Sequence, residues 1–211
     1  MNKNITSQTL SRLPVYFNYL VSLPEERKKG NISATAIAEA LGLNDVQVRK
    51  DLASVSSGGR PKVGYMTSEL MSDIGRFLGF ENHDRVVVAG MGNFGRAMLE
   101  YKGFEAYGFD IVCGFDCNKE RIGRDVGGKP VRHIDELDSF CRENGIRIGI
   151  ITVPERAAQE VCDRMAEAGI RFILNFAAVH LNAPKGVAVH NENISLTLAM
   201  LARGARAALP R

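Results

Sequence analysis

The chain has 211 residues, of which 45% are hydrophobic and 24% charged, with a formal net charge of +3. This length and apolar content indicate a soluble globular protein with room for two domains. The sequence holds no run of 18 apolar residues and no basic and apolar N-terminal regions of a secretory signal. These features argue against a membrane span or export, and we expect a cytoplasmic protein.

The small basic excess lies in the first third of the chain. Residues 1–80 contain 10 Lys and Arg against 7 Asp and Glu, whereas residues 81–211 contain 17 of each. Binding to nucleic acid requires localised cations more than a high total charge. The distribution is therefore a weak indication that the N-terminal part binds nucleic acid.

The four cysteines, at positions 113, 117, 141 and 162, are spaced unlike a zinc site or a dense disulfide framework. We expect reduced thiols that pack in the interior, and no metal site. Cys117 would respond to oxidants only if it were exposed, and the sequence gives no sign of a lowered thiol pKa.

Residues 33–55 are predicted to form two helices joined by a tight turn. Ser33 is placed to cap the first helix and Gly42 to end it, while Asn44 or Asp45 would cap the second. Such a pair is typical of a helix-turn-helix, whose second helix enters the major groove of DNA.

Helices are also predicted on both sides of this pair. Residues 11–23, with Pro14 in the first turn, have the apolar spacing of an amphipathic helix. Residues 67–78 have the same spacing, with Thr67 as N-cap and Gly79 as the stop.

The glycine-rich run over 56–65 predicts a small hairpin, which would form a wing beside the recognition helix. Arg and Gln read guanine and adenine through two hydrogen bonds each, Lys pairs with a phosphate or a guanine, and basic hairpin residues suit backbone or minor-groove contacts. The candidate DNA-binding residues are Gln47, Arg49, Lys50, Arg60 and Lys62. The alternative is a solvated helix face that carries an Arg-Lys pair.

From residue 85 the pattern changes to strands that alternate with helices. This order predicts a parallel sheet with right-handed crossovers, the Rossmann type of α/β fold. The predicted strands are 85–90, 106–116, 146–153, 172–175 and 187–190, with helices to about 101 and over 155–168. The expected domains are a winged helix-turn-helix over 1–80, a nucleotide-binding domain over 81–191 and a C-terminal helix within 192–211.

A glycine motif follows the first predicted strand and opens a helix. In this context three glycines permit the sharp turn, the approach of a pyrophosphate and close packing of the helix on the sheet, while free amides bind the phosphates. The candidate cofactor-binding residues in the motif are Gly90, Met91, Gly92, Asn93, Phe94 and Gly95. The alternative is a tight turn with no ligand.

Asp116 ends the second predicted strand, where a carboxylate accepts hydrogen bonds from both hydroxyls of an adenine ribose. Its charge would repel a 2′-phosphate, which favours NAD(H) over NADP(H). Thr152, Val153 and Pro154 follow a later strand at the same edge, where a nicotinamide would lie. The alternative for Asp116 is a solvated turn aspartate.

No catalytic residue stands out from the sequence. The histidines at 83, 133, 180 and 190 are scattered, and no spacing pairs them with an acid as in a dehydrogenase proton relay. We therefore expect a protein that is not an enzyme. An NAD-dependent oxidoreductase with an incidental helical domain, and an NAD-binding scaffold without a DNA role, remain alternatives.

Several motifs together resemble the Rex family of redox-sensing transcriptional repressors over nearly the whole length. They are LPVYFNYL, VRKDL, GMGNFG followed by Tyr101 and Gly103, FDCNKERIG, TVPERAAQEV and AGIRFILNFAAVHLNAP. The resemblance implies a homodimer whose winged-helix domains bind a palindromic operator and which NADH releases, and it adds Tyr101 to the cofactor-binding residues. It also implies that a C-terminal helix over about 193–208 is exchanged between protomers.

The chain departs from the family pattern at three places. The wing reads SVSSGGRPKVGY in place of a Gly-Lys-x-Gly-x-Gly-Tyr pattern, so operator preference is expected to differ. The family commonly has Arg at the position of Asn18 and an acid at that of Asn193. Since both are Asn here, we expect a weaker or differently wired sensing network.

Overall fold

A computed structural model describes residues 5–208 of the chain, with side chains for residues 5–203. The chain divides into two compact units, residues 1–82 and 83–211. Each unit has a core of its own and is described by itself.

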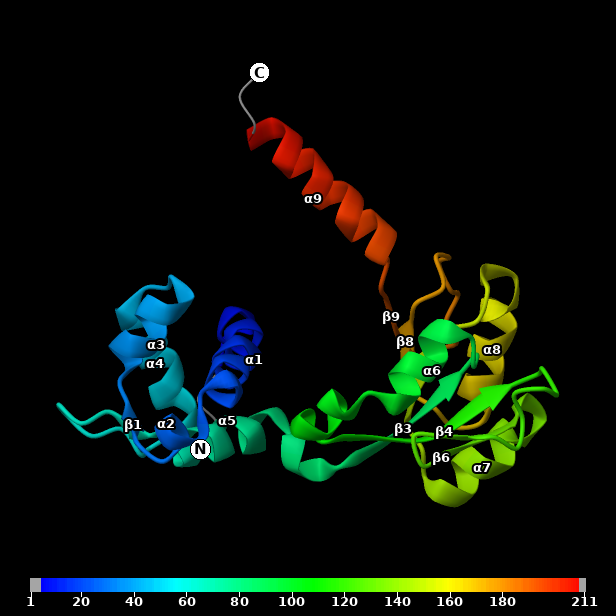
Figure 1. The fold of residues 1–211 in the computed structure, drawn as a ribbon, viewed down its shortest axis with the longest axis horizontal. Coiled ribbons are helices and arrows are strands. Elements are labelled where there is room, and N and C mark those ends of the chain that lie inside the picture. The colour runs from blue at the N-terminus through cyan, green and yellow to red at the C-terminus, as the bar shows by residue number, and fades with distance from the viewer. Residues whose placement is uncertain (1–4, 209–211) are drawn as a thin grey trace. The chain divides into compact units, whose positions relative to one another are not determined.

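The first unit is mainly helical (Figure 1). Its elements are α1 (Ser7–Ser22), α2 (Glu25–Lys28), β1 (Asn31–Ile32), α3 (Ala34–Leu41), α4 (Asp45–Val55), β2 (Tyr65–Met66) and α5 (Thr67–Leu78), followed by the 3-10 turn η1 (Phe80–Asn82). Apolar side chains from four of the helices, among them Leu13, Ile37, Leu52 and Leu70, are fully buried in its core. Helix α4 is therefore fixed in the unit by apolar packing against the neighbouring helices.

The caps of the predicted helix-turn-helix are confirmed. The side chain of Ser33 accepts a hydrogen bond from the amide of Ala36, and that of Asn44 accepts one from the amide of Gln47. Gly42, with φ of 64°, ends α3 in the left-handed conformation that glycine adopts without strain.

Two predictions for the flanking helices are wrong. Pro14 lies inside α1 rather than in its first turn, because the hydroxyl of Thr6 caps the helix and starts it at Ser7. The N-cap of α5 is Met66 rather than Thr67. Thr67 is buried and its hydroxyl donates to the carbonyl of Gly30, so it ties α5 to the chain before β1.

The predicted wing is a loop between α4 and β2 rather than a hairpin of two strands. Arg60 and Gly64 form a single antiparallel bridge, and Lys62 takes a φ of 64° at the turn. The strand that follows, β2, pairs with β1 in place of the wing. Gly64 is required because a Cβ there would collide with the carbonyl of Ile32.

The second unit contains a seven-stranded sheet with the order β5-β6-β4-β3-β7-β8-β9. All neighbouring strands are parallel except β5 and β6, which form an antiparallel pair at one edge. The strands are β3 (Asp84–Ala89), β4 (Phe109–Asp116), β5 (Asp125–Val126), β6 (Lys129–His133), β7 (Ile148–Ile151), β8 (Phe172–Asn175) and β9 (Ala188–Asn191). Without β5 this is the strand order of the Rossmann fold. From β3 the chain first adds strands on one side, β4 and β6, and then adds β7, β8 and β9 on the other side, so the order of the strands reverses between β3 and β7.

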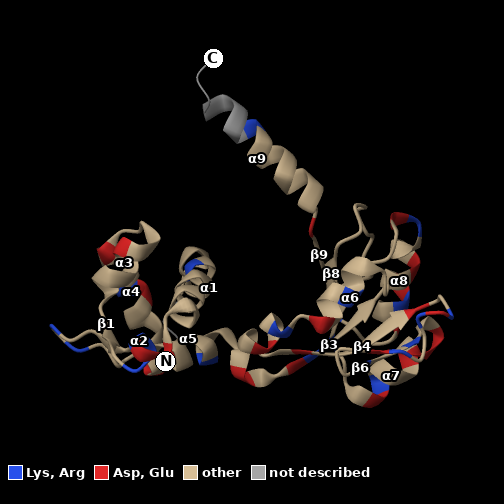
Figure 2. Cartoon of the chain, viewed as in Figure 1, with Lys and Arg blue, Asp and Glu red and all other residues tan. Residues whose placement is uncertain are grey.

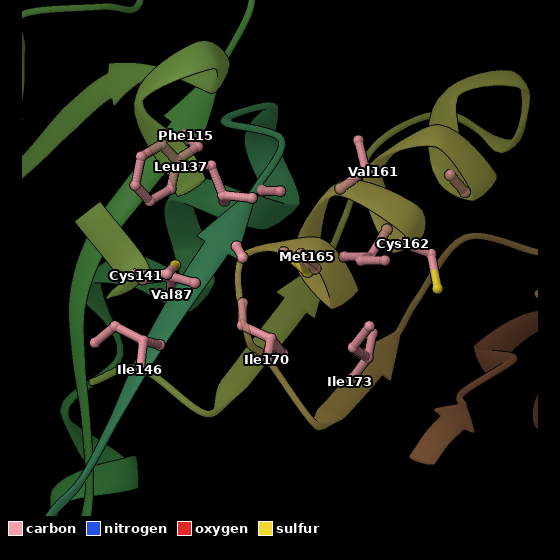
Figure 3. Close-up of a cluster of buried hydrophobic side chains, with 14 of the residues drawn as sticks. Val87, Phe115, Leu137, Cys141, Ile146, Val161, Cys162, Met165, Ile170 and Ile173 are labelled. Carbon is pink, nitrogen blue, oxygen red and sulfur yellow. The ribbon is translucent and has the colours of Figure 1, made fainter. Parts of the chain in front are cut away.

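Helices lie on both faces of the sheet. They are α6 (Asn93–Glu100), α7 (Leu137–Asn144) and α8 (Glu155–Glu167), with 3-10 turns η2 (Lys102–Tyr107) and η3 (Ile134–Glu136). Val86 and Val88 of β3 pack on the face covered by α6, where Leu99 is buried. Val87 and Ala89 face the other cluster, which Figure 3 shows with side chains of α7 and α8.

The sequence predictions for residues 117–145 were incomplete. The structure places β5, β6, η3 and α7 there, although no element was predicted. Strand β6 buries one residue, Val131, and α7 buries Leu137 and Cys141. Such short elements with few apolar positions give little periodic signal.

The last described element is α9 (Ile194–Ala208), which matches the helix predicted near 193–208. The remaining predicted C-terminal residues, 209–211, lie outside the described part. Figure 2 draws most of the coloured part of α9 in tan, as neither acidic nor basic. Among the residues that the structure describes, no helix is long and apolar enough to cross a membrane.

Candidate functional site

The glycine motif forms the turn between β3 and α6. Gly90 has φ of 100°, and a Cβ on it would meet Val153 at 2.8 Å, so this turn excludes other residues. A Cβ on Gly95 would collide with the carbonyl of Gly90, whereas one on Gly92 would meet no atom within 4 Å. The space above Gly92 is thus open to a ligand, while the other two glycines are fixed by the protein itself.

The first turn of α6 presents backbone amides to this space. The amides of Asn93, Phe94 and Gly95 have no acceptor within the helix, and they carry the positive end of its dipole. Met91 is different, because its side chain is buried against the sheet. The motif therefore presents amides without an acceptor in the helix but no Met91 side chain, and their binding of a phosphate stays a prediction.

A cavity of about 650 Å³ opens where the strand order reverses. Its floor comes from the ends of β3, β4 and β7, and one wall comes from α8. The lining residues are Gly90, Gly92, Phe115, Asp116, Cys117, Asn118, Arg121, Ile134, Thr152, Val153, Pro154, Arg156, Ala157, Glu160, Val161 and Arg164. In open α/β sheets this crevice is where nucleotides bind.

Asp116 is 7% exposed at the end of β4 and accepts three hydrogen bonds. Its Oδ2 accepts from the amide of Met91 at 2.7 Å and from Arg121 Nη1 at 3.0 Å, and its Oδ1 accepts from the amide of Asn118 at 2.8 Å. Burial opposes its ionisation, but these donors outweigh burial and hold the pKa of Asp116 below the ordinary 3.8. The predicted ribose ligand is thus a carboxylate set into the cavity wall.

Thr152 joins the ends of the two central strands. Its hydroxyl lies 3.0 Å from the carbonyl of Ala89 and 2.7 Å from that of Gly90, and its amide donates to Ala89. These bonds fix the glycine turn against β7. Thr152 therefore supports the cradle as well as lining it.

A second hollow of about 690 Å³ adjoins the cavity and shares Val153, Pro154 and Arg156 with it. Its remaining lining residues are Glu155, Phe176, Ala177 and Ala178. The ring of Phe176 contacts that of Phe94 edge-on, with centroids 4.8 Å apart. The predicted nicotinamide side of the site thus combines the aromatic ring of Phe176 with small apolar residues and the charged side chains of Glu155 and Arg156.

Tyr101 is not brought together with the other predicted cofactor residues within the described part of this chain. It ends α6, is 58% exposed, and its ring contacts Phe104 edge-on at 5.1 Å. Gly103 lies beneath the same ring, since a Cβ there would collide with it. Its role toward the cofactor stays a prediction.

Two histidines have acidic partners that the sequence spacing did not indicate. His190 lies 2.8 Å from Glu192, and His133 lies 3.2 Å from Asp135. Neither histidine lines the cavity. Among the described residues there is also no group of three or more His, Cys, Asp or Glu that could hold a metal ion.

Three cysteines, at 113, 141 and 162, are buried in the core, and Cys117 is exposed at the cavity. Burial raises the pKa of Cys113 to about 11 and that of Cys141 to about 12. The buried thiols are therefore unreactive packing groups, as expected from the sequence.

In the first unit, Asp51 connects α4 to α1. It is 2% exposed and accepts hydrogen bonds from four side chains. The donors are Thr9 at 3.1 Å, Arg12 at 2.7 and 3.1 Å, Tyr16 at 2.8 Å and Gln47 at 3.0 Å. Burial alone would raise its pKa, but these donors hold the pKa of Asp51 below its ordinary value.

The predicted DNA-binding residues all have exposed side chains. Gln47 donates to Asp51 through Nε2, which orients its amide, and Arg49 forms an exposed ion pair with Asp45 at 3.2 Å. Lys50 borders a hollow of about 350 Å³ between α4 and the start of α1. Arg60 and Lys62 lie on the wing, where Figure 2 shows basic residues.

Of the three departures from the family pattern, the asparagine at 193 has a local structural explanation. Asn193 Oδ1 accepts from the amide of Leu196 at 2.9 Å, which is the pattern of an N-cap for α9. Asn18 is exposed on α1. The Asn at 193 thus performs a capping task that does not require a negative charge.

Several cavity residues were missed in the sequence. Arg156, Ala157, Glu160, Val161 and Arg164 lie on one face of α8. Their spacing of three and four residues after Pro154 was a usable signal. Asn118 and Arg121 belong to the loop after Asp116, where nearness in sequence was the signal.

The residues present fit a dinucleotide. The open space above Gly92, the free amides of α6 and the cavity that begins at Asp116 are continuous with the aromatic hollow at Phe176. A ligand with a ribose, a pyrophosphate and a second flat ring would match these parts in order.

Two family models match the chain. The model described as "CoA binding domain" matches residues 81–179, and the one described as "Putative DNA-binding protein N-terminus" matches residues 4–53. The first covers the sheet up to Val179 and the second covers the helix-turn-helix as far as Ala53.

Curated relatives match over most of their length. The redox-sensing transcriptional repressor Rex of Streptomyces coelicolor is 39% identical over 95% of this chain and 78% of the relative. That of Carboxydothermus hydrogenoformans is 41% identical over 93% and 94%, and that of Porphyromonas gingivalis is 36% identical over 95% and 92%.

Solved structures of RSP, a Rex-family repressor, share the fold. RSP in complex with β-NAD+ and operator DNA has a TM-score of 0.85 at 29% identity, over 97% of this chain and 94% of RSP. RSP in complex with β-NADH has a TM-score of 0.81, over 97% and 95%. The chain therefore belongs to the Rex family of redox-sensing transcriptional repressors.

Proposed function

We propose that this protein is a cytoplasmic transcriptional repressor that binds a palindromic operator as a homodimer and is released from it by NADH. The observation that carries the proposal is the cavity between Gly92 and Asp116, built as a dinucleotide site, in a chain whose other unit is a winged helix-turn-helix. RSP, solved with NAD+ and operator DNA and with NADH, supports the same pairing of ligands.

Helix α9 supports the dimer. Its residues Ile194, Leu196, Leu198, Met200 and Leu201 are each 53–68% exposed. At about 100° per residue they fall on two opposite sides of the helix, and so many exposed apolar side chains on one helix are normally covered by a partner. Exchange of this helix between two protomers would bury it, with residues 193–208 as the exchanged segment.

For the switch, the dinucleotide must bind two arrangements of the dimer with different free energies. A coupling of about 2.7 kcal/mol between NADH and DNA gives a hundredfold change in operator affinity. The nicotinamide ring is neutral in NADH and positive in NAD+. In the proposed site this ring lies in the hollow at Phe176, so the hollow is the part of the site that contacts the group whose charge differs.

The test begins with a palindromic operator selected from random duplexes by the purified full chain. Fluorescence anisotropy then gives operator affinity alone, with NADH and with NAD+. We expect NADH to weaken binding about a hundredfold and NAD+ to leave it strong. An operator affinity that is unchanged at saturating NADH would refute the proposal.

The alternatives predict different results. An NAD-scaffold without a DNA role predicts that no duplex is selected, and that Arg49→Ala changes nothing. An oxidoreductase predicts hydride transfer to a small carbonyl substrate. No histidine lines the cavity walls that the structure describes.

A further inference from the structure

Arg121 and Asp116 form an ion pair at the wall of the cavity. Arg121 Nη1 lies 3.0 Å from Asp116 Oδ2, and both residues line the same space. The side chain of Asp116 is 6% exposed, whereas that of Arg121 is 44% exposed. The carboxylate is therefore fixed, and the guanidinium is the member of the pair that is free to move.

The carboxylate has little capacity left for a ribose. A carboxylate has about four acceptor positions, and three donors already occupy those of Asp116. Two of the donors are the backbone amides of Met91 and Asn118, which the glycine turn and the loop hold in place. Since two ribose hydroxyls need two acceptor positions, a bound ribose must displace Arg121.

A displaced Arg121 remains beside the ribose, because it follows Asp116 by five residues in a loop of the same wall. An arginine at this place is what binds the 2′-phosphate of NADP(H) in Rossmann sites, through two parallel hydrogen bonds. The other cations of the cavity are less suited. Arg164 is paired with Asp135 at 2.6 Å, and Arg156 lies toward the second hollow.

We propose that Arg121 is a latent ligand for a 2′-phosphate, kept from that role by Asp116, so that the pair rather than Asp116 alone sets selectivity between NADH and NADPH. The inference rests on the proposed function, in which this cavity binds a dinucleotide. It assigns a specificity role to a residue that the sequence did not single out.

The test compares the dissociation constants of NADH and NADPH by isothermal titration calorimetry on the full chain. Asp116→Asn is expected to shift the NADPH to NADH preference toward NADPH by about a hundredfold, since a repulsive charge is lost and Arg121 is released. In Asp116→Asn/Arg121→Met most of that shift is expected to disappear, to within about tenfold of the wild-type preference.

Lys119→Met is the matched control, because Lys119 is an exposed cation of the same loop that does not line the cavity. Combined with Asp116→Asn, it is expected to leave the shift in place. An equal shift with and without Arg121 would overturn the proposal, and so would loss of the shift in Asp116→Asn/Arg164→Met instead. If the wild-type chain bound no NADH at all, the proposed function itself would fail.

Discussion

The two units each contain a buried carboxylate, and the two carboxylates are satisfied in different ways. Asp51 receives its hydrogen bonds from four side chains of α1 and α4. Asp116 receives two from backbone amides and one from Arg121, and it borders a cavity. Both have a pKa below the ordinary value, so the shift alone does not tell the two apart.

The two carboxylates differ in whether a ligand could replace one of their hydrogen-bond donors. Around Asp51 every donor is a packed or helix-bound side chain of the same unit, so the carboxylate holds α4 in place against α1. Around Asp116 the side-chain donor is half exposed, and a ligand hydroxyl can take its place. We infer that the first carboxylate is structural and the second is a binding group.

The two carboxylates are expected to differ most in how much their removal lowers the free energy of unfolding. Asp51→Ala leaves Arg12 without its buried partner and is expected to lower the free energy of unfolding of the first unit by about 3 kcal/mol. Asp116→Ala is expected to cost the second unit less, about 2 kcal/mol, because the buried amide of Met91 loses its acceptor whereas Arg121 can turn to water. Hydrogen exchange of buried amides measures each unit separately.

Asp45→Ala is the control for the first unit, because Asp45 also pairs with an arginine of α4 but is exposed. It is expected to cost about 0.5 kcal/mol. Equal costs for Asp51→Ala and Asp116→Ala would remove the distinction between a structural and a binding carboxylate.

The next effect separates the two roles of the glycine motif. Gly92→Ala puts a Cβ into open space, so it is expected to leave stability unchanged while weakening NADH binding by about a hundredfold. Gly95→Ala collides with Gly90 and is expected to destabilise the unit as well. Thermal unfolding and calorimetric NADH titration distinguish them. Unimpaired NADH binding by Gly92→Ala would contradict the site.

A smaller effect is expected on the recognition helix. Arg49→Ala removes an exposed cation and is expected to weaken operator binding about tenfold, without changing NADH affinity. Glu25→Ala, which removes an exposed charge paired with Lys28 in α2, is the control. If both variants bound the operator as the wild type does, α4 would not be the DNA-reading helix.

The pH dependence of stability is expected to show a smaller effect. A carboxylate whose pKa is lowered by folding stabilises the protein above the unfolded pKa of about 3.8, and this contribution disappears as pH falls through the folded value. Below about pH 4 the unfolding free energy is therefore expected to fall by up to about 1.4 kcal/mol per pH unit for each such group. In Asp51→Asn the free energy of unfolding is expected to fall less steeply with pH, by up to about 1.4 kcal/mol per pH unit, because one such group is absent. Urea unfolding at about pH 5, 4 and 3 measures this slope.

Many elements and part of the candidate site could be predicted from the sequence, because the residues that form them also give strong local signals. The Gly90 turn must follow a strand and open a helix, and Ser33, Gly42 and Asn44 mark helix ends by hydrogen bonds within a few residues. These features depend on local backbone chemistry. They were therefore predicted at the residues where the structure has them.

Features that depend on contacts distant in sequence were not predicted. The bond between Thr9 and Asp51 spans 42 residues, and the pairing of β1 with β2 replaces the expected hairpin. Nearness to Asp116 in sequence places Arg121 in the same loop, but it does not show that Arg121 and two backbone amides together occupy three acceptor positions of that carboxylate. Sequence patterns identify elements and motifs, whereas the hydrogen bonds to a buried acceptor depend on how distant segments pack.

We propose that one free energy couples NADH binding in the cavity of the second unit to operator binding. Linkage requires that NADH and operator weaken each other by the same factor. The direct measurement is the dissociation constant of NADH for the full chain, free and saturated with operator. We expect the dissociation constant of NADH to be about a hundredfold higher when the chain is bound to operator, and an equal constant in both states would exclude this coupling.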